Sequence, residues 1–202
     1  MPGVRAQTRA AAGLRIVLNM LRAVLFTFAG VVWCVRSLQA FSDPEYMDPE
    51  SASDWFAVLS FSAGLFALAF ALPMFARLIG GRMVFRLSVV PAAGAALAGL
   101  SNLFEDALHW SGPPGSSGWA FWLFILGTGM TGIGLVAFSI LVAVVSSGRR
   151  RLLAAVPAAT LIGVMLFESG GGVLILAAWL AAAAMALGHP SRTAALAAPT
   201  SP

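Results

Sequence analysis

The connections between the apolar stretches of this chain alternate between acidic ones and ones whose charges are all arginine. The 8 acidic residues fall in three short segments, which contain Asp43, Glu45, Asp48, Glu50 and Asp54, then Glu105 and Asp106, and finally Glu168. The alternate connections carry only arginine, namely Arg77, Arg82 and Arg86 in one and Arg149, Arg150 and Arg151 in the other. Positive residues are retained on the cytoplasmic side of a membrane, so a chain that crosses a membrane repeatedly acquires this segregation. The pattern therefore predicts a membrane protein and the way it is threaded.

Composition points to lipid as the main solvent. Hydrophobic residues make up 59% of the 202 residues, charged residues make up 10%, and the mean hydropathy is +0.90. A soluble domain has about 25% charged residues, so this chain cannot cover a water-facing surface. The net charge of +4 does not indicate nucleic acid, because the arginines flank apolar stretches. We therefore expect the lipid bilayer as partner and no nucleic acid. The absence of lysine and the abundance of alanine and glycine are typical of a GC-rich bacterial gene.

The expected fold class is an all-α integral membrane protein, a bundle of six transmembrane helices. A helix needs about 20 apolar residues to cross the hydrocarbon core. The expected spans are residues 14–35, 55–76, 87–108, 119–145, 152–167 and 173–187. The last two are short, and the glycines at 170–172 between them allow a tight reversal, which predicts a helical hairpin. Residues 1–13 are expected to form a basic cytoplasmic N-terminus, and residues 188–202 a disordered cytoplasmic tail.

The arginines also set the orientation. Arg5, Arg9 and Arg15 place the N-terminus inside, and both arginine-bearing connections and Arg192 then lie inside as well. All the acidic residues lie outside, where Arg36 is the only cation. Six spans with both termini in the cytoplasm satisfy every connection, so we expect a multipass protein of the inner (plasma) membrane. A cleaved signal peptide is the alternative for the first span, but its apolar run is longer than a signal-peptide core.

Small residues predict how the helices pack. Helices in lipid associate through close backbone approach, which small residues four positions apart allow. Gly94 and Ala98 have this spacing in the third span, and we expect Gly127, Gly132 and Gly134 of the fourth to line an interface between helices. The alternative is that glycine is merely frequent in membrane helices. At the helix starts, Ser53 or Asp54 is the expected cap of the second span, and Ser116 or Ser117 that of the fourth.

One group of residues has the chemistry of a site. Asn102, Glu105, Asp106 and His109 recur at spacings of three and four, so they share a helix face at the outer end of the third span. Glu105 and His109, together with Glu168 from the hairpin, form a candidate zinc site, because zinc accepts carboxylate and imidazole ligands. The competing interpretation is structural. The dipole at a helix C-terminus disfavours acidic residues, so Arg36 would pair with Glu105, Asp106 or Glu168. A solvated acidic rim is the third interpretation.

Arg22 is the one charge clearly inside a span. Ionisable groups at that depth are functional candidates by default. Arg22 lies close to the inner edge, however, so its side chain is expected to extend to the cytoplasmic headgroups with help from Asn19.

Three functions stay open. We find no Walker loop, dinucleotide-binding glycine pattern, catalytic triad or CxxC pair, so no cofactor is expected. The first hypothesis is therefore a non-enzymatic accessory or envelope component with an acidic outer face. Such a component would have another membrane protein as its partner. The second is a small transporter or channel, whose hydroxyl groups would have to converge on one cavity. The third is a metal-dependent membrane enzyme that uses Glu105, His109 and Glu168.

Overall fold

Apolar segments of this length fold as helices because lipid offers no hydrogen-bond partner to the backbone, and a helix satisfies its own N–H and C=O groups. The computed structural model describes residues 2–42, 51–107 and 118–188, and the regular structure within these ranges is helical throughout. The prediction of an all-α protein is therefore confirmed for the described part of the chain.

The elements follow one another along the chain as long helices and short turns. They are α1 (Pro2–Ser42), α2 (Ala52–Ile79), α3 (Arg82–Asn102), the π-helical turn η1 (Leu103–Ala107), α4 (Trp119–Val145), the 3-10 helix η2 (Gly148–Ala154), α5 (Ala155–Met165), the 3-10 turn η3 (Phe167–Ser169) and α6 (Gly172–Gly188). Among the described residues, the four helices α1 to α4 are long and apolar enough to cross a membrane, whereas α5 and α6 are shorter apolar helices.

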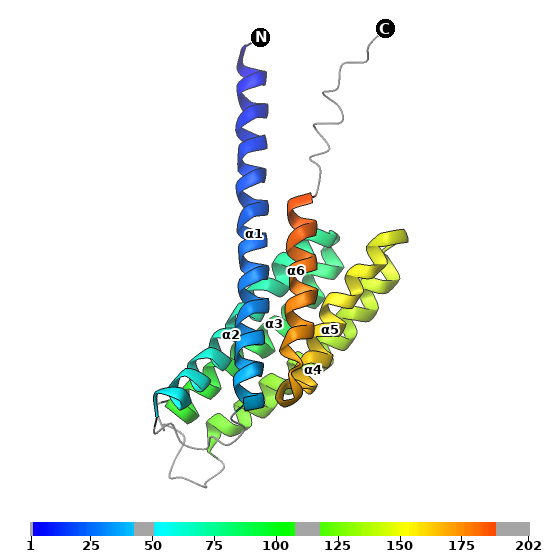
Figure 1. The fold of residues 1–202 in the computed structure, drawn as a ribbon. Helices are drawn as coiled ribbons and strands as arrows, with labels where there is room; N and C mark the ends of the chain where they lie inside the picture. Colours follow the sequence, from blue (N-terminus) through cyan, green and yellow to red (C-terminus); the bar gives the residue numbers. More distant parts are fainter. Residues whose placement is uncertain (1, 43–50, 108–117, 189–202) are drawn as a thin grey trace.

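The helices form a closed ring. Each one contacts the next along the chain, and contacts between α1 and α6 close the ring. Successive helices run in opposite directions, so the start of α1 and the end of α6 lie at the same end of the bundle (Figure 1). The N-terminal part of α1 projects well beyond the other helices at this end (Figure 1).

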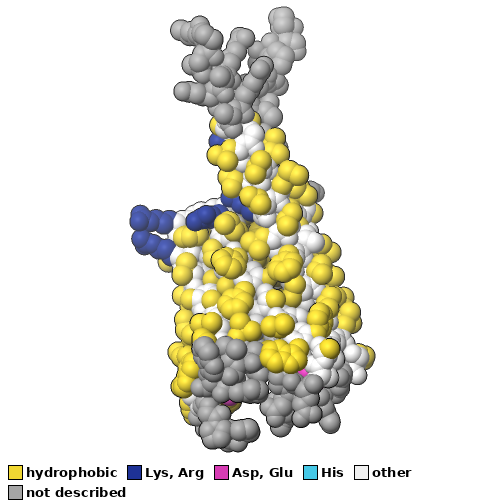
Figure 2. Space-filling model, turned by 90° about the vertical axis from the view of Figure 1, so that its left-hand side faces the viewer, with side chains coloured by type: hydrophobic (Ala, Val, Ile, Leu, Met, Phe, Trp, Pro, Cys, Tyr) yellow, Lys and Arg dark blue, Asp and Glu magenta, His cyan; other side chains and the backbone are white. Residues whose placement is uncertain are grey.

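The two ends of the ring carry opposite charges. Arg77, Arg82 and Arg151 lie where α2 ends, where α3 begins and in η2, and we call this the arginine end. Asp54 in the first turn of α2, Glu105 in η1 and Glu168 in η3 lie at the opposite, acidic end. Figure 2 shows the basic side chains gathered toward one end and the acidic side chains toward the other, with a mainly apolar surface between them.

Aromatic side chains fill the middle of the ring. Phe26, Phe75, Phe138 and Trp179 come from four helices and are fully buried, and we call them the aromatic plug. The ring centroids of Phe26 and Trp179 are 5.3 Å apart, those of Phe75 and Trp179 are 5.8 Å apart, and those of Phe75 and Phe138 are 6.3 Å apart. Because Phe75 lies in the last turns of α2, the plug occupies the half of the bundle nearer the arginine end.

Small residues bring α3 and α4 together, as the sequence predicts for two of the three glycines. A Cβ atom on Gly127 would lie 2.6 Å from the backbone nitrogen of Ala98, and one on Gly134 would lie 2.7 Å from the Cδ of Pro91. The prediction is wrong for Gly132, where a Cβ would have no atom of the described residues within 4 Å. Gly127 and Gly134 are seven residues apart and share a face, whereas Gly132 lies on another side of the helix.

The helix ends differ from the sequence-based expectations. The N-cap of α2 is Ser51, which forms a capping box with Asp54, in place of Ser53 or Asp54 as the cap. Gly118 precedes α4 without a side-chain cap, in place of Ser116 or Ser117. Helices α1, α2 and α3 begin before their expected spans, at Pro2, Ala52 and Arg82. The expected disordered tail lies almost entirely outside the described residues.

Candidate functional site

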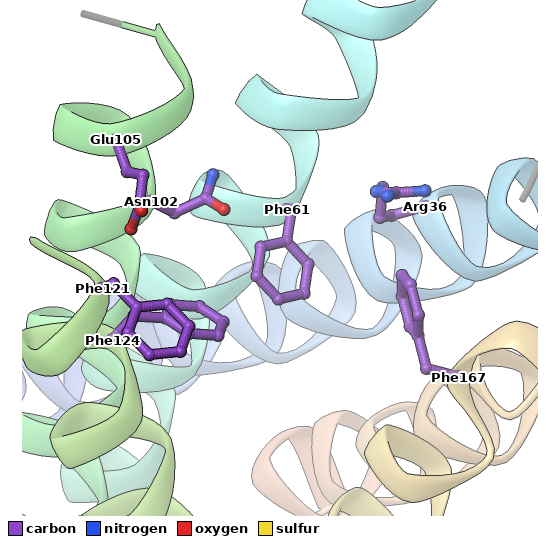
Figure 3. Close-up of a pocket in the computed structure, with 7 residues that line it drawn as sticks. All are labelled: Arg36, Phe61, Asn102, Glu105, Phe121, Phe124 and Phe167. Atoms are coloured by element: carbon purple, nitrogen blue, oxygen red, sulfur yellow. The ribbon is translucent and has the colours of Figure 1, made fainter. Parts of the chain in front are cut away.

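A cavity of about 420 Å³ lies at the acidic end of the ring. It is lined by Arg36, Phe61, Asn102, Glu105, Phe121, Phe124 and Phe167, which come from α1, α2, α3, η1, α4 and η3 (Figure 3). We call it the polar cavity, because a guanidinium, an amide and a carboxylate lie among its four aromatic rings. This size and this mixture of groups are typical of small-molecule sites, which have volumes of roughly 300–1,000 Å³.

Arg36 forms one wall of the polar cavity. Its side chain is only 6% exposed, and its guanidinium carbon lies 5.1 Å from the centroid of the Phe167 ring. The neighbouring residue, Ser37, holds that ring in place. The Ser37 hydroxyl donates a hydrogen bond of 2.6 Å to the Phe167 carbonyl oxygen and accepts one of 3.0 Å from the Gly172 N–H. One turn of α1 thus supplies the charge and also fixes the hairpin that carries its stacking partner.

The end of α3 forms the opposite wall. Asn102 is buried, and its Nδ2 donates to Ser62 Oγ at 3.0 Å and to the Val58 carbonyl oxygen at 3.4 Å. The Ser101 hydroxyl donates to the Ala120 carbonyl oxygen. These bonds fasten the last turn of α3 to α2 and α4. The chain then continues as the π-helical turn η1, which places the half-buried Glu105 on the cavity. Single π-helical turns are frequent at functional sites.

A second cavity, of about 450 Å³, adjoins the first. Its lining residues are Trp33, Phe61, Phe124, Thr128, Val164, Met165, Leu166, Phe167, Glu168 and Ser169. Phe61, Phe124 and Phe167 line both cavities. Met165 is 80% exposed and Leu166 is 50% exposed, so this cavity opens at the outer surface of the ring between α4 and the hairpin. We call it the lateral cavity.

The structure brings together part of the predicted polar cluster. Arg36, Asn102 and Glu105 line the polar cavity, and Glu168 lies on the adjoining lateral cavity. His109 and the side chain of Asp106 lie outside the described residues. Within the part of the chain that the structure describes, no three His, Cys, Asp or Glu residues are placed to hold a metal ion. Because His109 is not among those residues, the zinc hypothesis and the pairing of Arg36 with an acidic residue both stay predictions.

Sequence reasoning missed the aromatic walls and Ser37. Phe61, Phe124 and Phe167 are indistinguishable in the sequence from the other phenylalanines of the spans. Ser37 and Phe167 are 130 residues apart, and their hydrogen bond depends on the ring closing between α1 and α6. No local pattern carries that information.

Arg22 lies away from the two cavities. Its Nη1 donates a hydrogen bond of 3.1 Å to Asn19 Oδ1, one turn nearer the start of α1. Gly30 of α1 packs against Leu176 of α6, and the two helices run antiparallel. Counting about 1.5 Å per residue from that contact places Arg22 about one turn inside the end of α6. This position agrees with a side chain that extends toward the headgroups, which stays a prediction.

Together, the fold and the two cavities define a class: an α-helical protein with membrane-length helices and a charged cavity at one end. Comparison of the chain with protein-family models, curated proteins and solved structures found no match. The function therefore has to be argued from the chemistry of the site, since fold alone does not determine it.

Proposed function

We propose that this chain is a six-span protein of the plasma membrane with its acidic end outside, and that it acts by binding a ligand in the polar cavity. In this proposal it is a non-enzymatic accessory or envelope component. The observation that carries the proposal is a cavity with charged walls at one end of a ring whose other half is filled by the aromatic plug.

The lengths of α5 and α6 are compatible with six crossings where the bilayer is thinned. The 11 residues of α5 rise about 16 Å, and the apolar residues Leu152 to Ala154 at the end of η2 add about 6 Å. The 17 residues of α6 rise about 25 Å. Both lengths fall short of the roughly 30 Å of a hydrocarbon core, and local thinning of the bilayer accommodates such a mismatch. The hairpin also closes the ring against α4 and α1, so it belongs to the same layer as the four long helices.

The plug supports binding over conduction. A channel needs a wetted path through the bilayer, and four fully buried aromatic side chains occupy the middle of the ring on the arginine side. The hydroxyls that such a path would use are engaged on separate helices. Thr131 donates to the Gly127 carbonyl oxygen, and Thr160 donates to Val156 and accepts from Trp179 Nε1. These bonds satisfy the hydroxyls locally, which is the arrangement expected of helix packing.

The described walls of the polar cavity support recognition over catalysis. They offer a guanidinium, a carboxylate and an amide among phenylalanine rings, which are groups that select charge and shape. The metal-enzyme hypothesis depends on His109. Stoichiometric metal in the purified protein that is lost in His109→Ala would establish that hypothesis in place of this one.

Reconstitution into liposomes tests whether the chain binds or conducts. We expect the wild-type protein to leave ion and small-solute flux at the level of protein-free liposomes, because the plug closes the ring. A variant that combines Phe75→Ala with Phe138→Ala should raise that flux, which shows that the assay detects an open ring. Saturable flux through the wild-type protein would contradict the proposal and favour a transporter.

A further inference from the structure

The geometry points to the ligand: we propose that the polar and lateral cavities together hold one phospholipid of the outer leaflet with a zwitterionic headgroup. The phosphate lies at Arg36, the ammonium lies at Glu105, and an acyl chain leaves through the lateral cavity. This inference rests on the proposed function, because it names the ligand of the same site.

The shape of the site suits an amphiphile. The polar cavity contains the charged groups, and the lateral cavity is lined mainly by apolar side chains. Phe61, Phe124 and Phe167 form walls of both, so a ligand passes from one into the other along the same three rings. A water-soluble ligand would use only the polar cavity, whereas a lipid uses both.

Arg36 provides the phosphate contact. Its guanidinium carbon lies 5.1 Å from the centroid of the Phe167 ring, and the N–H groups in the plane of a guanidinium recognise phosphate oxygens in pairs. Burial strengthens such a contact, because the surroundings screen charge less than water does.

The opposite wall selects the cation. In Figure 3, Arg36 and Phe167 lie on one side of Phe61, and Glu105 and Asn102 lie on the other. A headgroup that spans the cavity therefore contacts a positive group, Arg36, at one end and a negative group, Glu105, at the other. A phosphate bound at Arg36 would face the Glu105 carboxylate across the cavity, so the charge pattern favours a zwitterion such as phosphoethanolamine over a purely anionic headgroup.

The lateral cavity gives the acyl chain a way out. Met165 and Leu166 are largely exposed apolar residues at the end of α5, and Thr128 lies on the facing side, on α4. Glu168 and Ser169 lie on the same cavity in η3, toward the acidic end. In the proposed topology this opening faces the outer leaflet just below its headgroups.

Native mass spectrometry of the full-length, delipidated protein in detergent tests the ligand class. The probes are dioleoyl phosphatidylethanolamine, dioleoyl phosphatidate, dioleoylglycerol and water-soluble O-phosphoethanolamine. We expect one phosphatidylethanolamine per chain, held about tenfold or more tightly than dioleoylglycerol, because a charge-assisted contact contributes about that factor. Phosphatidate should bind with intermediate affinity. Binding of O-phosphoethanolamine as tight as that of the lipid would overturn the inference, as would equal binding of all three lipids.

Matched variants test the residues. Arg36→Gln should weaken phosphatidylethanolamine binding about tenfold, whereas Arg77→Gln should leave it unchanged, although Arg77 also stacks on a phenylalanine, with its guanidinium carbon 4.8 Å from the Phe85 ring. Glu105→Gln should remove the preference for phosphatidylethanolamine over phosphatidate without abolishing binding.

The lateral cavity has its own test, which stays informative if Arg36→Gln fails to fold. Thr128→Phe fills the cavity and should abolish lipid binding, and Ile133→Phe on the exposed side of the same helix should not. Unchanged binding in Thr128→Phe would overturn the lipid site. That failure differs from failure of the proposed function, which would show as wild-type flux in liposomes whatever the lipid measurements give.

Discussion

The contact between α3 and α4 at Gly127 gives a sharp prediction about stability. In Gly127→Ala the new Cβ would lie 2.6 Å from the Ala98 nitrogen and 2.8 Å from the Gly94 carbonyl oxygen. Both are backbone atoms, so neither can rotate away, and the helices must separate. Overpacking of this kind costs about 1–3 kcal/mol, and we take the upper part of that range because the contacts are with backbone. The higher helix propensity of alanine offsets about 1 kcal/mol. We therefore expect Gly127→Ala to destabilise the protein by about 2 kcal/mol.

Gly129→Ala is the matched control. It makes the same chemical change on the same helix, where the added Cβ would meet no atom of the described residues within 4 Å. It should be neutral or stabilising by up to about 1 kcal/mol, and Gly132→Ala should behave in the same way. Unfolding in detergent, followed by circular dichroism against added denaturant, measures the free-energy difference between the variants. Equal stabilities of Gly127→Ala and Gly129→Ala would refute the close contact between α3 and α4.

Three further changes test other contacts of the ring, each by the same unfolding measurement. Ser37→Ala removes the hydroxyl that bonds the Phe167 carbonyl and the Gly172 N–H, so it should lower the free energy of unfolding by about 2 kcal/mol. The control Ser60→Ala loses only a bond within its own helix and should lower it much less. Equal losses of stability in the two variants would contradict the role of Ser37. Ser51→Ala removes the capping box of α2 and should cost about 1 kcal/mol, and a neutral result would show that the cap is not used. Trp179→Phe loses the hydrogen bond from Nε1 to the Thr160 hydroxyl and should lower the free energy of unfolding by about 1 kcal/mol. A variant more stable than the wild-type protein would show that this bond is not made.

Charge and hydropathy predict much of this fold because lipid imposes simple requirements. The apolar runs locate the helices, and the glycines after Glu168 correctly predict the hairpin between α5 and α6. Helix ends are harder to predict, since polar residues outside a span continue the helix when their propensity allows it, as at the start of α1. Gly132 shows a further limit. Small residues indicate that a helix makes a close contact, but where a helix has several glycines the sequence does not show which of them lie at that contact.

Some residues of the candidate site could be predicted from the sequence, and others could not. Its charged members, Arg36 and Glu105, stand out in the sequence because charges are rare in this chain, and both line the polar cavity. Its aromatic members and Ser37 depend on which helices become neighbours. The contact of α1 with α6 joins segments from the two ends of the chain, and no local spacing predicts it.

Cysteine labelling in intact cells tests the proposed topology most directly. Cys34 is the only cysteine and is buried, so Cys34→Ala provides a background for single cysteines at the exposed positions Glu168 and Arg82. The six-span account predicts that a membrane-impermeant maleimide labels Glu168→Cys in intact cells and labels Arg82→Cys only after the cells are permeabilised. If Glu168→Cys also requires permeabilisation, the hairpin does not reach the outer face and the account is contradicted.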